Sequence, residues 1–251
     1  MEGKVALITG GSDGIGFATA QVLLERGATV AICARRKEKL DEAEKALSGL
    51  GTFEAHQLDV SDEAAYTALI EAIVARHGRI DMLVNNAMSV HYAPITHLTM
   101  DHWRKDFAVN ADAVFTGTRA AMKAMMKQGS GSIVNIASTN GIKAAPYMSS
   151  YSASKAALIQ FTAVAAMEGA PANVRVNTVI PGMILTAATD DYLEKAGEQG
   201  QKTVAAIPMQ RGARPREVAN AIAFMLSDEA SYITGAALPV DGGKAVQLYL
   251  P

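Results

Sequence analysis

The chain has 251 residues, with 23 basic and 25 acidic side chains, so its formal net charge is −2. This balance excludes the strongly basic surface that nucleic-acid binding requires, and we expect no nucleic-acid partner. Hydrophobic residues make up 49% and charged residues 19%, which is typical of one large globular domain with a substantial core. The single cysteine, Cys33, lies in an apolar run, which predicts a buried side chain rather than a catalytic thiol.

Nothing in the sequence predicts export, membrane insertion or metal binding. The N-terminal stretch MEGKVALITGG leaves no room for the parts of a signal peptide, and no apolar run is long enough for a membrane span. With one cysteine and no membrane partner, a cytoplasmic location is the expectation. The five histidines form no ligand-like spacing or cluster, so we expect no metal site and place them at the surface or at helix ends.

Short apolar runs alternate with longer helical patterns along the whole chain. Strands are predicted at 4–9, 28–33, 53–58, 79–84, 131–137, 173–179 and 235–240. Helices are predicted at 14–26, 37–48, 62–77, 101–127, 151–169 and 215–227. Continuous apolar strands alternating with helices predict an α/β fold: a doubly wound, parallel seven-stranded sheet of Rossmann type, with helices on both faces. No linker interrupts the pattern, so residues 1–251 are expected to form a single domain.

The segment from about 183 to 212 departs from this alternation. It is helical in parts, carries small and polar residues, and lies between the sixth strand and the last helix. In doubly wound sheets, ligands bind beyond the carboxyl ends of the strands, where this insertion emerges. We expect a mobile flap on the substrate side, with a plain surface excursion as the alternative.

A glycine-rich turn, TGGSDGIG (9–16), joins the first strand to the first helix. Gly10, Gly14 and Gly16 allow backbone N–H groups to approach a pyrophosphate at the positive end of that helix. The lysine and Ser/Thr pair of a nucleoside triphosphate loop does not follow Gly16. The turn therefore favours a dinucleotide over ATP.

The end of the second strand indicates which dinucleotide is bound. Ala34 occupies the place where an NAD site has a carboxylate for the ribose hydroxyl, and Arg35 and Arg36 follow it. Guanidinium groups pair well with phosphate, so this pattern favours NADP(H). NAD(H) remains possible, because the arginines could equally form a solvated basic start to the next helix.

Seven motifs occur in the order and context found in one enzyme family. They are TGGSDGIG (9–16), LDV (58–60), NNA (85–87), VN (109–110), IAS (136–138), YSASK (151–155) and PGMILT (181–186). Over essentially its whole length the chain resembles the short-chain dehydrogenase/reductase family. One departure stands out, because Met88 replaces the glycine that follows NNA in this family. The local loop or the pocket wall should differ there, since a methionine side chain needs space.

The resemblance implies a role for each matching position. The catalytic residues would be Asn110, Ser138, Tyr151 and Lys155. Ser138 would bind the substrate oxygen, Tyr151 would transfer the proton, and Lys155 would bind the nicotinamide ribose, with Asn110 holding a relay water. The cofactor-binding residues would be Gly10, Ser12, Asp13, Gly14, Ile15, Gly16, Arg35, Arg36, Asp59, Val60, Asn86, Ala87, Tyr151, Lys155, Pro181, Gly182, Ile184 and Thr186.

Tyr151 and Lys155 are four residues apart, so on a helix they share one face. A free tyrosine is a poor base at neutral pH, and a neighbouring ammonium would favour the phenolate. We therefore expect Lys155 to lower the pKa of Tyr151. Of the seven tyrosines, only Tyr151 has a lysine at this spacing, so Tyr147 is assigned to the substrate pocket instead. A surface aromatic–cation pair is the alternative.

The expected pocket wall is mostly apolar and has no arginine to hold a carboxylate. Its substrate-contacting candidates are Met88, Asn140, Tyr147, Met183 and Tyr192, with Val90, Tyr92 and Leu185 beside them. This wall favours a neutral ketone or secondary alcohol, although the methionines could equally fill the core. We expect an NADP(H)-preferring oxidoreductase. The alternatives are an NAD-dependent dehydrogenase and a catalytically idle dinucleotide-binding protein.

The resemblance also suggests a homotetramer or homodimer, formed partly through the helices at 101–127 and 151–169.

Overall fold

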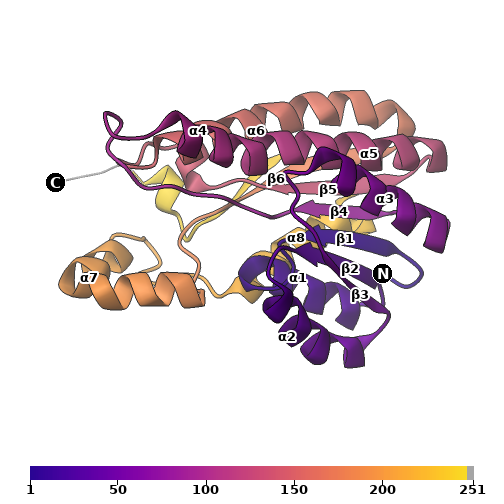
Figure 1. Ribbon diagram of the computed structural model, residues 1–251, viewed down its shortest axis with the longest axis horizontal. Coiled ribbons are helices and arrows are strands. Elements are labelled where there is room, and N and C mark those ends of the chain that lie inside the picture. The colour runs from indigo at the N-terminus through magenta and orange to yellow at the C-terminus, as the bar shows by residue number, and fades with distance from the viewer. Residues whose placement is uncertain (248–251) are drawn as a thin grey trace.

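The computed structural model describes residues 1–247, apart from the side chains of residues 187 and 188. Seven parallel strands form one sheet in the order β3-β2-β1-β4-β5-β6-β7. The strands are β1 (Val5–Thr9), β2 (Thr29–Ala34), β3 (Phe53–Gln57), β4 (Met82–Asn85), β5 (Gly131–Ile136), β6 (Val174–Pro181) and β7 (Ala237–Val240). The predicted doubly wound sheet is confirmed (Figure 1).

Helices cover both faces of the sheet (Figure 1). They are α1 (Gly14–Glu25), α2 (Lys37–Leu47), α3 (Glu63–His77), α4 (Met100–Phe107), α5 (Ala113–Gln128), α6 (Ser149–Gly169), α7 (Ala187–Ala205) and α8 (Pro215–Leu226). Successive strand residues point to opposite faces, so Ile8 packs in the core with α1 and α8 while Leu7 packs in the core with α3 and α5. Cys33 is buried in the second of these cores, and burial raises the pKa of its thiol to about 12.

The chain reverses its direction of winding between β1 and β4. From β1 it builds outward through β2 and β3, then returns to place β4 on the other side of β1. The carboxyl ends of β1 and β4 therefore lie side by side, which is where doubly wound sheets bind ligands. The hydroxyl of Thr9 joins them, because it accepts hydrogen bonds from the backbone N–H groups of Asn86 (2.9 Å) and Ala87 (3.0 Å).

The helix predicted at 101–127 is wrong as one continuous element. The structure has α4, then a π-helical turn at Ala108–Asp112, then α5. The fully buried Asn110 lies in this turn, and its amide bonds to the backbone of Ser89 and the hydroxyl of Ser154. Apolar periodicity does not reveal a wider turn that is held by such long-range polar contacts. The predicted strand at 79–84 likewise starts later, at Met82.

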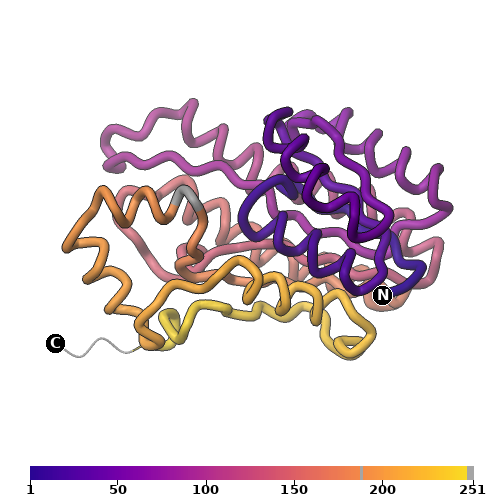
Figure 2. The backbone as a smooth tube through the Cα atoms, turned by 90° about the horizontal axis from the view of Figure 1, so that it is seen from below, coloured from indigo at the N-terminus to yellow at the C-terminus, as the bar shows by residue number. Residues whose placement is uncertain are grey.

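The segment from 183 to 212 carries α7, which projects beyond the end of the sheet in both views (Figures 1 and 2). The helix is interrupted at Gly197, where φ is 51° and ψ is −124°. Backbone bonds between Ala213 and its neighbours Met183 (2.9 Å) and Leu185 (2.8 Å) join the two ends of the segment. The insertion thus leaves and returns at one place, although its role as a flap stays a prediction.

None of the helices described is both long enough and apolar enough to cross a membrane. Within residues 1–247, no group of three or more His, Cys, Asp or Glu side chains is arranged to hold a metal ion.

Candidate active site

The glycine turn after β1 makes a cradle that side chains would fill. A Cβ atom on Gly16 would lie 2.3 Å from the carbonyl oxygen of Gly10, so only glycine fits there. Gly14 has a φ of +54°, and a Cβ at this position would lie 3.3 Å from the Thr186 methyl group. Asp13 caps the start of α1 by accepting a hydrogen bond from the N–H of Gly14 (2.7 Å). Bare backbone at a helix N-terminus suits a pyrophosphate, so the residues present fit a dinucleotide.

Two further segments close around this cradle. The Asn86 side chain donates to the carbonyl oxygens of Thr9 (3.0 Å) and Gly10 (3.1 Å), which fixes the turn against the end of β4. Thr186 begins α7 as its N-cap and lies against Gly14, as the close approach above indicates. The structure thus brings the predicted pyrophosphate and nicotinamide ends of the site together. Val60 and Ile184 are both buried, each in one of the two large hydrophobic cores.

Arg35 and Arg36 lie exposed just beyond β2, which ends at Ala34. Arg35 pairs with Asp59 at 4.0 Å and Arg36 pairs with Asp13 at 3.5 Å. Such exposed pairs are weak, so either guanidinium can exchange its carboxylate for a phosphate at small cost. The position predicted for cofactor selection therefore carries two available cations and no carboxylate on the strand end itself.

Ser138, Tyr151 and Lys155 meet at the carboxyl end of β5. Ser138 follows this strand and caps the short turn Thr139–Gly141, where its hydroxyl accepts a hydrogen bond from the N–H of Asn140 (3.2 Å). Tyr151 and Lys155 face this turn from α6, and both are buried. The Lys155 amine donates to the carbonyl oxygen of Ile136 (2.7 Å) and lies 5.8 Å from the centre of the Tyr151 ring.

The prediction that Tyr151 has a lowered pKa is wrong for this arrangement. Burial raises the pKa of Tyr151, the Ser138 hydroxyl partly lowers it, and the charges of Tyr92 and Asp106 raise it again. Lys155 does not offset this effect, because burial lowers its own pKa from 10.5 to about 7. Its amine is thus about half neutral at pH 7 and offers the phenolate only part of a positive charge.

Asn110 is brought to the same region, since its amide donates to the Ser154 hydroxyl (3.1 Å) on α6. That hydroxyl in turn donates to the carbonyl oxygen of Tyr151 (2.8 Å). All four predicted catalytic residues therefore lie on adjoining elements, with Asn110 held rigidly from two sides. Their roles in turnover stay predictions.

The predicted substrate residues form the outer rim of this region. Met88, Tyr147 and Tyr192 are between 52% and 60% exposed, whereas Asn140 is half-buried and donates to the Met148 sulfur. Met88 has no left-handed backbone and its side chain is exposed, so replacing glycine leaves the loop unstrained. Tyr147 does have a positive φ of 67°, held by a hydrogen bond from the N–H of Ala93 to its carbonyl oxygen.

A cavity of about 420 Å³ lies elsewhere, at the amino ends of the strands. Lys4, Asp81 and Arg175 line it, and none of the predicted site residues does. Parallel sheets bind ligands at the opposite, carboxyl edge. The candidate site is therefore defined by its converging side chains and not by this cavity.

Sequence reasoning missed the polar residues behind Tyr151. Asp106 is completely buried, and His91, a loop residue whose side chain is 30% exposed, contacts it. One signal existed in the sequence. Asp106 and Asn110 share a helix face with Trp103, where a charged residue facing the core is unexpected.

Comparison with known proteins agrees with this geometry. Residues 10–245 match the family model described as enoyl-(acyl carrier protein) reductase. The chain belongs to the short-chain dehydrogenase/reductase family. Members of this family bind a nicotinamide dinucleotide and act on alcohol and carbonyl groups, and this chain is an oxidoreductase of that type.

Two relatives show the range of this short-chain dehydrogenase/reductase group. A 3-oxoacyl-[acyl-carrier-protein] reductase of Thermotoga maritima is 41% identical over 247 residues, which cover 98% of this chain and 99% of the relative. An NADP-dependent (R)-specific alcohol dehydrogenase of Lentilactobacillus kefiri is 38% identical over 251 residues, with 98% of each chain covered. Among solved structures, an NAD⁺-bound xylitol dehydrogenase superimposes with a TM-score of 0.91 at 32% identity, covering 96% of this chain and 99% of that one.

The buried amine of Lys155 should make stability depend on pH. Its pKa is about 7 in the folded protein against 10.5 ordinarily, so between these values the unfolded chain binds more protons and folding stability rises with pH. Relative to Lys155→Met, the wild-type free energy of unfolding should rise by about 1–2 kcal/mol from pH 7 to 9, measured by urea titration. Lys123→Met, which removes an exposed lysine on α5, is the control. If the difference in unfolding free energy between the wild type and Lys155→Met stayed constant from pH 7 to 9, the lowered pKa of Lys155 would be contradicted.

Proposed function

We propose that this protein is an NADP(H)-preferring oxidoreductase that interconverts a neutral ketone and a secondary alcohol. The observation that carries the proposal is the burial of Tyr151 and Lys155 beside Ser138, next to a glycine cradle that fits a dinucleotide. Buried titratable groups placed together at the ligand-binding edge of a sheet are typical of an active site.

A bound nicotinamide dinucleotide supplies or accepts the hydride. The Ser138 hydroxyl accepts a hydrogen bond from the N–H of Asn140 and lies beside Tyr151, where it would donate its own proton to the substrate oxygen. The Tyr151 hydroxyl gives its proton to that oxygen during reduction and takes it back during oxidation. Because burial keeps Tyr151 protonated, this arrangement suits the reductive direction at neutral pH.

Lys155 supports Tyr151 by exchanging protons. With a pKa of about 7, its amine can both gain and lose a proton under neutral conditions. Its hydrogen bond to Ile136 fixes the amine at the end of β5, 5.8 Å from the centre of the Tyr151 ring, and Lys155 would bind the ribose of the cofactor there. Asn110, which is bonded to Ser154 on the same helix, would hold the water through which that proton is replaced.

The preference for NADP(H) rests on Ala34, Arg35 and Arg36. The relative from Lentilactobacillus kefiri is named as NADP-dependent, whereas the xylitol dehydrogenase structure holds NAD⁺, so both cofactors occur among similar proteins. Here two exposed guanidinium groups flank the strand end, and the strand itself contributes no carboxylate. This combination suits a 2′-phosphate.

The segment at 183–212 acts in this proposal as a flap over the substrate, within a single domain spanning 1–251. Two observations support this. Backbone hydrogen bonds of Ala213 to Met183 and Leu185 join the two ends of the segment, and Thr186, the N-cap of α7, lies against the glycine turn. Tyr192 and Met183 would then reach the substrate together with Met88, Asn140 and Tyr147. A mostly apolar rim with three exposed tyrosines, Tyr92, Tyr147 and Tyr192, suits a neutral substrate. The cytoplasmic location stays a prediction.

The chain is also proposed to assemble as a homodimer or homotetramer through α5 and α6. Phe115 on α5 and Phe161 on α6 stack edge to face at 5.9 Å, and Phe115 remains 47% exposed. Val164 and Met167 continue the exposed apolar surface along α6. Contiguous apolar patches of this kind mark protein interfaces.

Tyr151→Phe removes the proton donor and should lower kcat for ketone reduction by about 10²–10⁴-fold. The NADPH dissociation constant, measured by fluorescence titration, should change by no more than about threefold, since the ring stays in place. Tyr232→Phe alters a fully exposed tyrosine and serves as the control. Substantial turnover by the Tyr151→Phe protein would reject its role, and tight NADPH binding without wild-type turnover of any ketone would favour the idle protein.

Arg35→Asp should reverse the cofactor preference. We expect kcat/KM to favour NADPH over NADH in the wild type, and the variant to lose about 10-fold or more with NADPH, because the carboxylate repels a 2′-phosphate. Lys45→Asp makes the same charge change at the far end of α2 and should leave the ratio unaltered. A wild type that prefers NADH would instead support the NAD-dependent dehydrogenase.

Phe115→Lys should weaken assembly, because it places a charge within an apolar contact. Light scattering should give the wild type a mass that is a multiple of 26.4 kDa and give the variant a smaller one. Leu50→Lys, at an exposed apolar residue after α2, should keep the wild-type mass. A wild-type mass of one chain across micromolar concentrations would contradict the proposal.

A further inference from the structure

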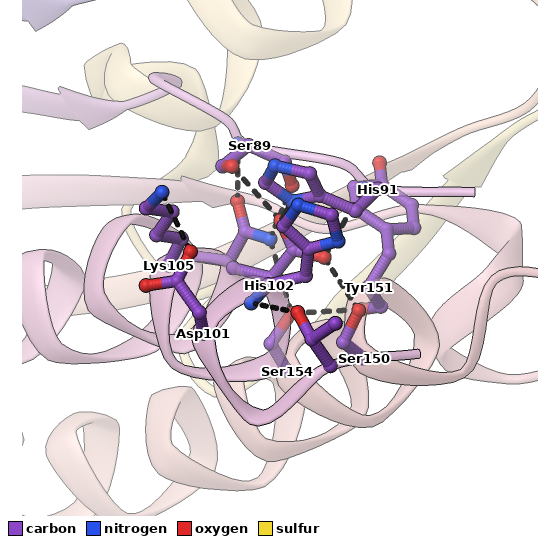
Figure 3. A network of polar contacts seen from close by, with 11 residues as sticks. Ser89, His91, Asp101, His102, Lys105, Ser150, Tyr151 and Ser154 are labelled. Carbon is purple, nitrogen blue, oxygen red and sulfur yellow. Dashed lines mark hydrogen bonds and ion pairs between the residues drawn. The ribbon is translucent and has the colours of Figure 1, made fainter. Parts of the chain in front are cut away.

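A network of polar contacts surrounds Ser89, His91 and Ser150 next to Tyr151 (Figure 3), and a buried carboxylate accepts hydrogen bonds from these three residues. Asp106, in the last turn of α4, has no exposed surface. Its Oδ1 accepts hydrogen bonds from the Ser89 hydroxyl (2.8 Å) and from His91 Nδ1 (2.7 Å). Its Oδ2 accepts from the Ser150 hydroxyl (2.5 Å) and from the N–H of His91 (3.2 Å). Four donors thus converge on one carboxylate.

This arrangement is costly unless every donor is in place. An isolated carboxylate strongly resists transfer from water into a protein interior, and hydrogen bonds must replace its hydration. Among the ion pairs within residues 1–247, the partner of Asp106 is His91 and no lysine or arginine. The four donors, and not a full counter-charge, therefore hold the group in its buried position.

The donors come from two segments that each carry predicted site residues. Ser89 and His91 belong to the loop after β4, between the substrate residues Met88 and Tyr92. Ser150 belongs to the first turn of α6, immediately before Tyr151. The backbone of Ser89 is held a second time, since its N–H donates to Asn110 Oδ1 (2.9 Å) and its carbonyl accepts from Asn110 Nδ2 (2.7 Å).

We propose that Asp106 is a positioning residue of this active site, which clamps the substrate-side loop 88–92 to the helix turn that carries Tyr151. This inference rests on the proposed function. His91 completes the clamp from its more exposed side, where its ring stacks on His102 at 4.2 Å. Asp106 itself need not touch the substrate, because it acts through Ser89, His91 and Ser150.

The same carboxylate acts on Tyr151 through its charge. Burial is the main cause that raises the pKa of Tyr151; the Ser138 hydroxyl lowers it, and the charges of Tyr92 and Asp106 add smaller increases. Lys155 faces the phenol from the same helix. On the other side of the carboxylate lie His91, His102 and the exposed Asp101–Lys105 pair. Removing the Asp106 charge should therefore make Tyr151 a stronger acid.

The four hydrogen bonds to Asp106 form a clamp and do not form a proton path. Each of them donates to the carboxylate. Across the part of the chain that the structure describes, neither the Ser89 nor the Ser150 hydroxyl continues toward the Tyr151 hydroxyl. A relay would need groups that accept on one side and donate on the other.

Asp106→Asn tests the clamp with little change in volume. The amide cannot accept all four bonds and carries no charge, so the KM for the ketone should rise about fivefold or more while the KM for NADPH stays within about twofold. The pKa assigned to Tyr151 in the pH profile of kcat/KM should fall, because the negative charge of Asp106 is one of the causes that raise it. A purely structural role of Asp106 would leave this pKa in the pH profile of kcat/KM unchanged. Asp101→Asn, an exposed carboxylate on the same helix, should leave both unchanged.

Two variants at position 91 separate hydrogen bonding from ring packing. His91→Phe keeps a ring next to His102 but loses the donor, and should raise the ketone KM as Asp106→Asn does. His91→Asn restores an N–H donor near the Nδ1 position and should recover most of the wild-type KM. If Asp106→Asn does not fold, as judged by circular dichroism, His91→Phe and Ser150→Ala carry the test, since each removes one donor only.

Amide hydrogen exchange in residues 88–92 measures how firmly this loop is held, independently of catalytic turnover. Asp106→Asn should speed exchange there by about 10-fold or more, because the N–H of His91 loses its acceptor. A folded Asp106→Asn protein with wild-type exchange, KM and pH profile would overturn the inference. If Tyr151→Phe retained full activity, the proposed function would fail, and the exchange result would still decide separately whether Asp106 holds the loop.

Discussion

The site depends on one contact, the hydrogen bond from the buried Lys155 amine to the carbonyl oxygen of Ile136. It joins α6 to the last residue of β5, so the turn that carries Ser138 must lie next to Tyr151. The fit is close, because a Cβ on Gly141 would lie 3.0 Å from the Lys155 backbone. Burial of this amine lowers its pKa to about 7, so the interaction that positions the phenol also makes Lys155 able to exchange protons at neutral pH.

A second polar chain keeps the sheet beneath this contact in place. The Tyr66 hydroxyl donates to Asn85 (2.8 Å), Asn85 donates to Asn135 (2.8 Å), and Asn135 donates to Thr162 (2.9 Å) on α6. This series of hydrogen bonds thus runs from α3 through β4 and β5 to α6. Buried polar groups that are all paired specify one arrangement of their elements, since any shift would leave a donor unsatisfied. The carboxylate of Asp106, with four hydrogen-bond donors around it, is a second case of fully paired buried polar groups.

Much of the architecture could be predicted because its signals are local. Alternating apolar strands and helical patterns predicted the parallel sheet, and the glycine spacing at 9–16 predicted the cradle that the structure contains. The i, i+4 spacing of Tyr151 and Lys155 likewise placed both side chains on one helix face, and both are buried there. The π-helical turn at Ala108–Asp112 was not predicted, because it depends on contacts between Asn110 and residues distant in sequence.

Periodicity predicted the fold class, and motifs with set spacing carried the family resemblance that implies the candidate catalytic side chains. The direction of the Tyr151 pKa shift became visible in the folded structure, because desolvation depends on how many distant segments cover a group. The folded structure also revealed Asp106 and His91, whose contacts span 15 residues of chain between them. Burial and long-range hydrogen bonding depend on residues that are distant in the sequence, so no local sequence pattern predicts them.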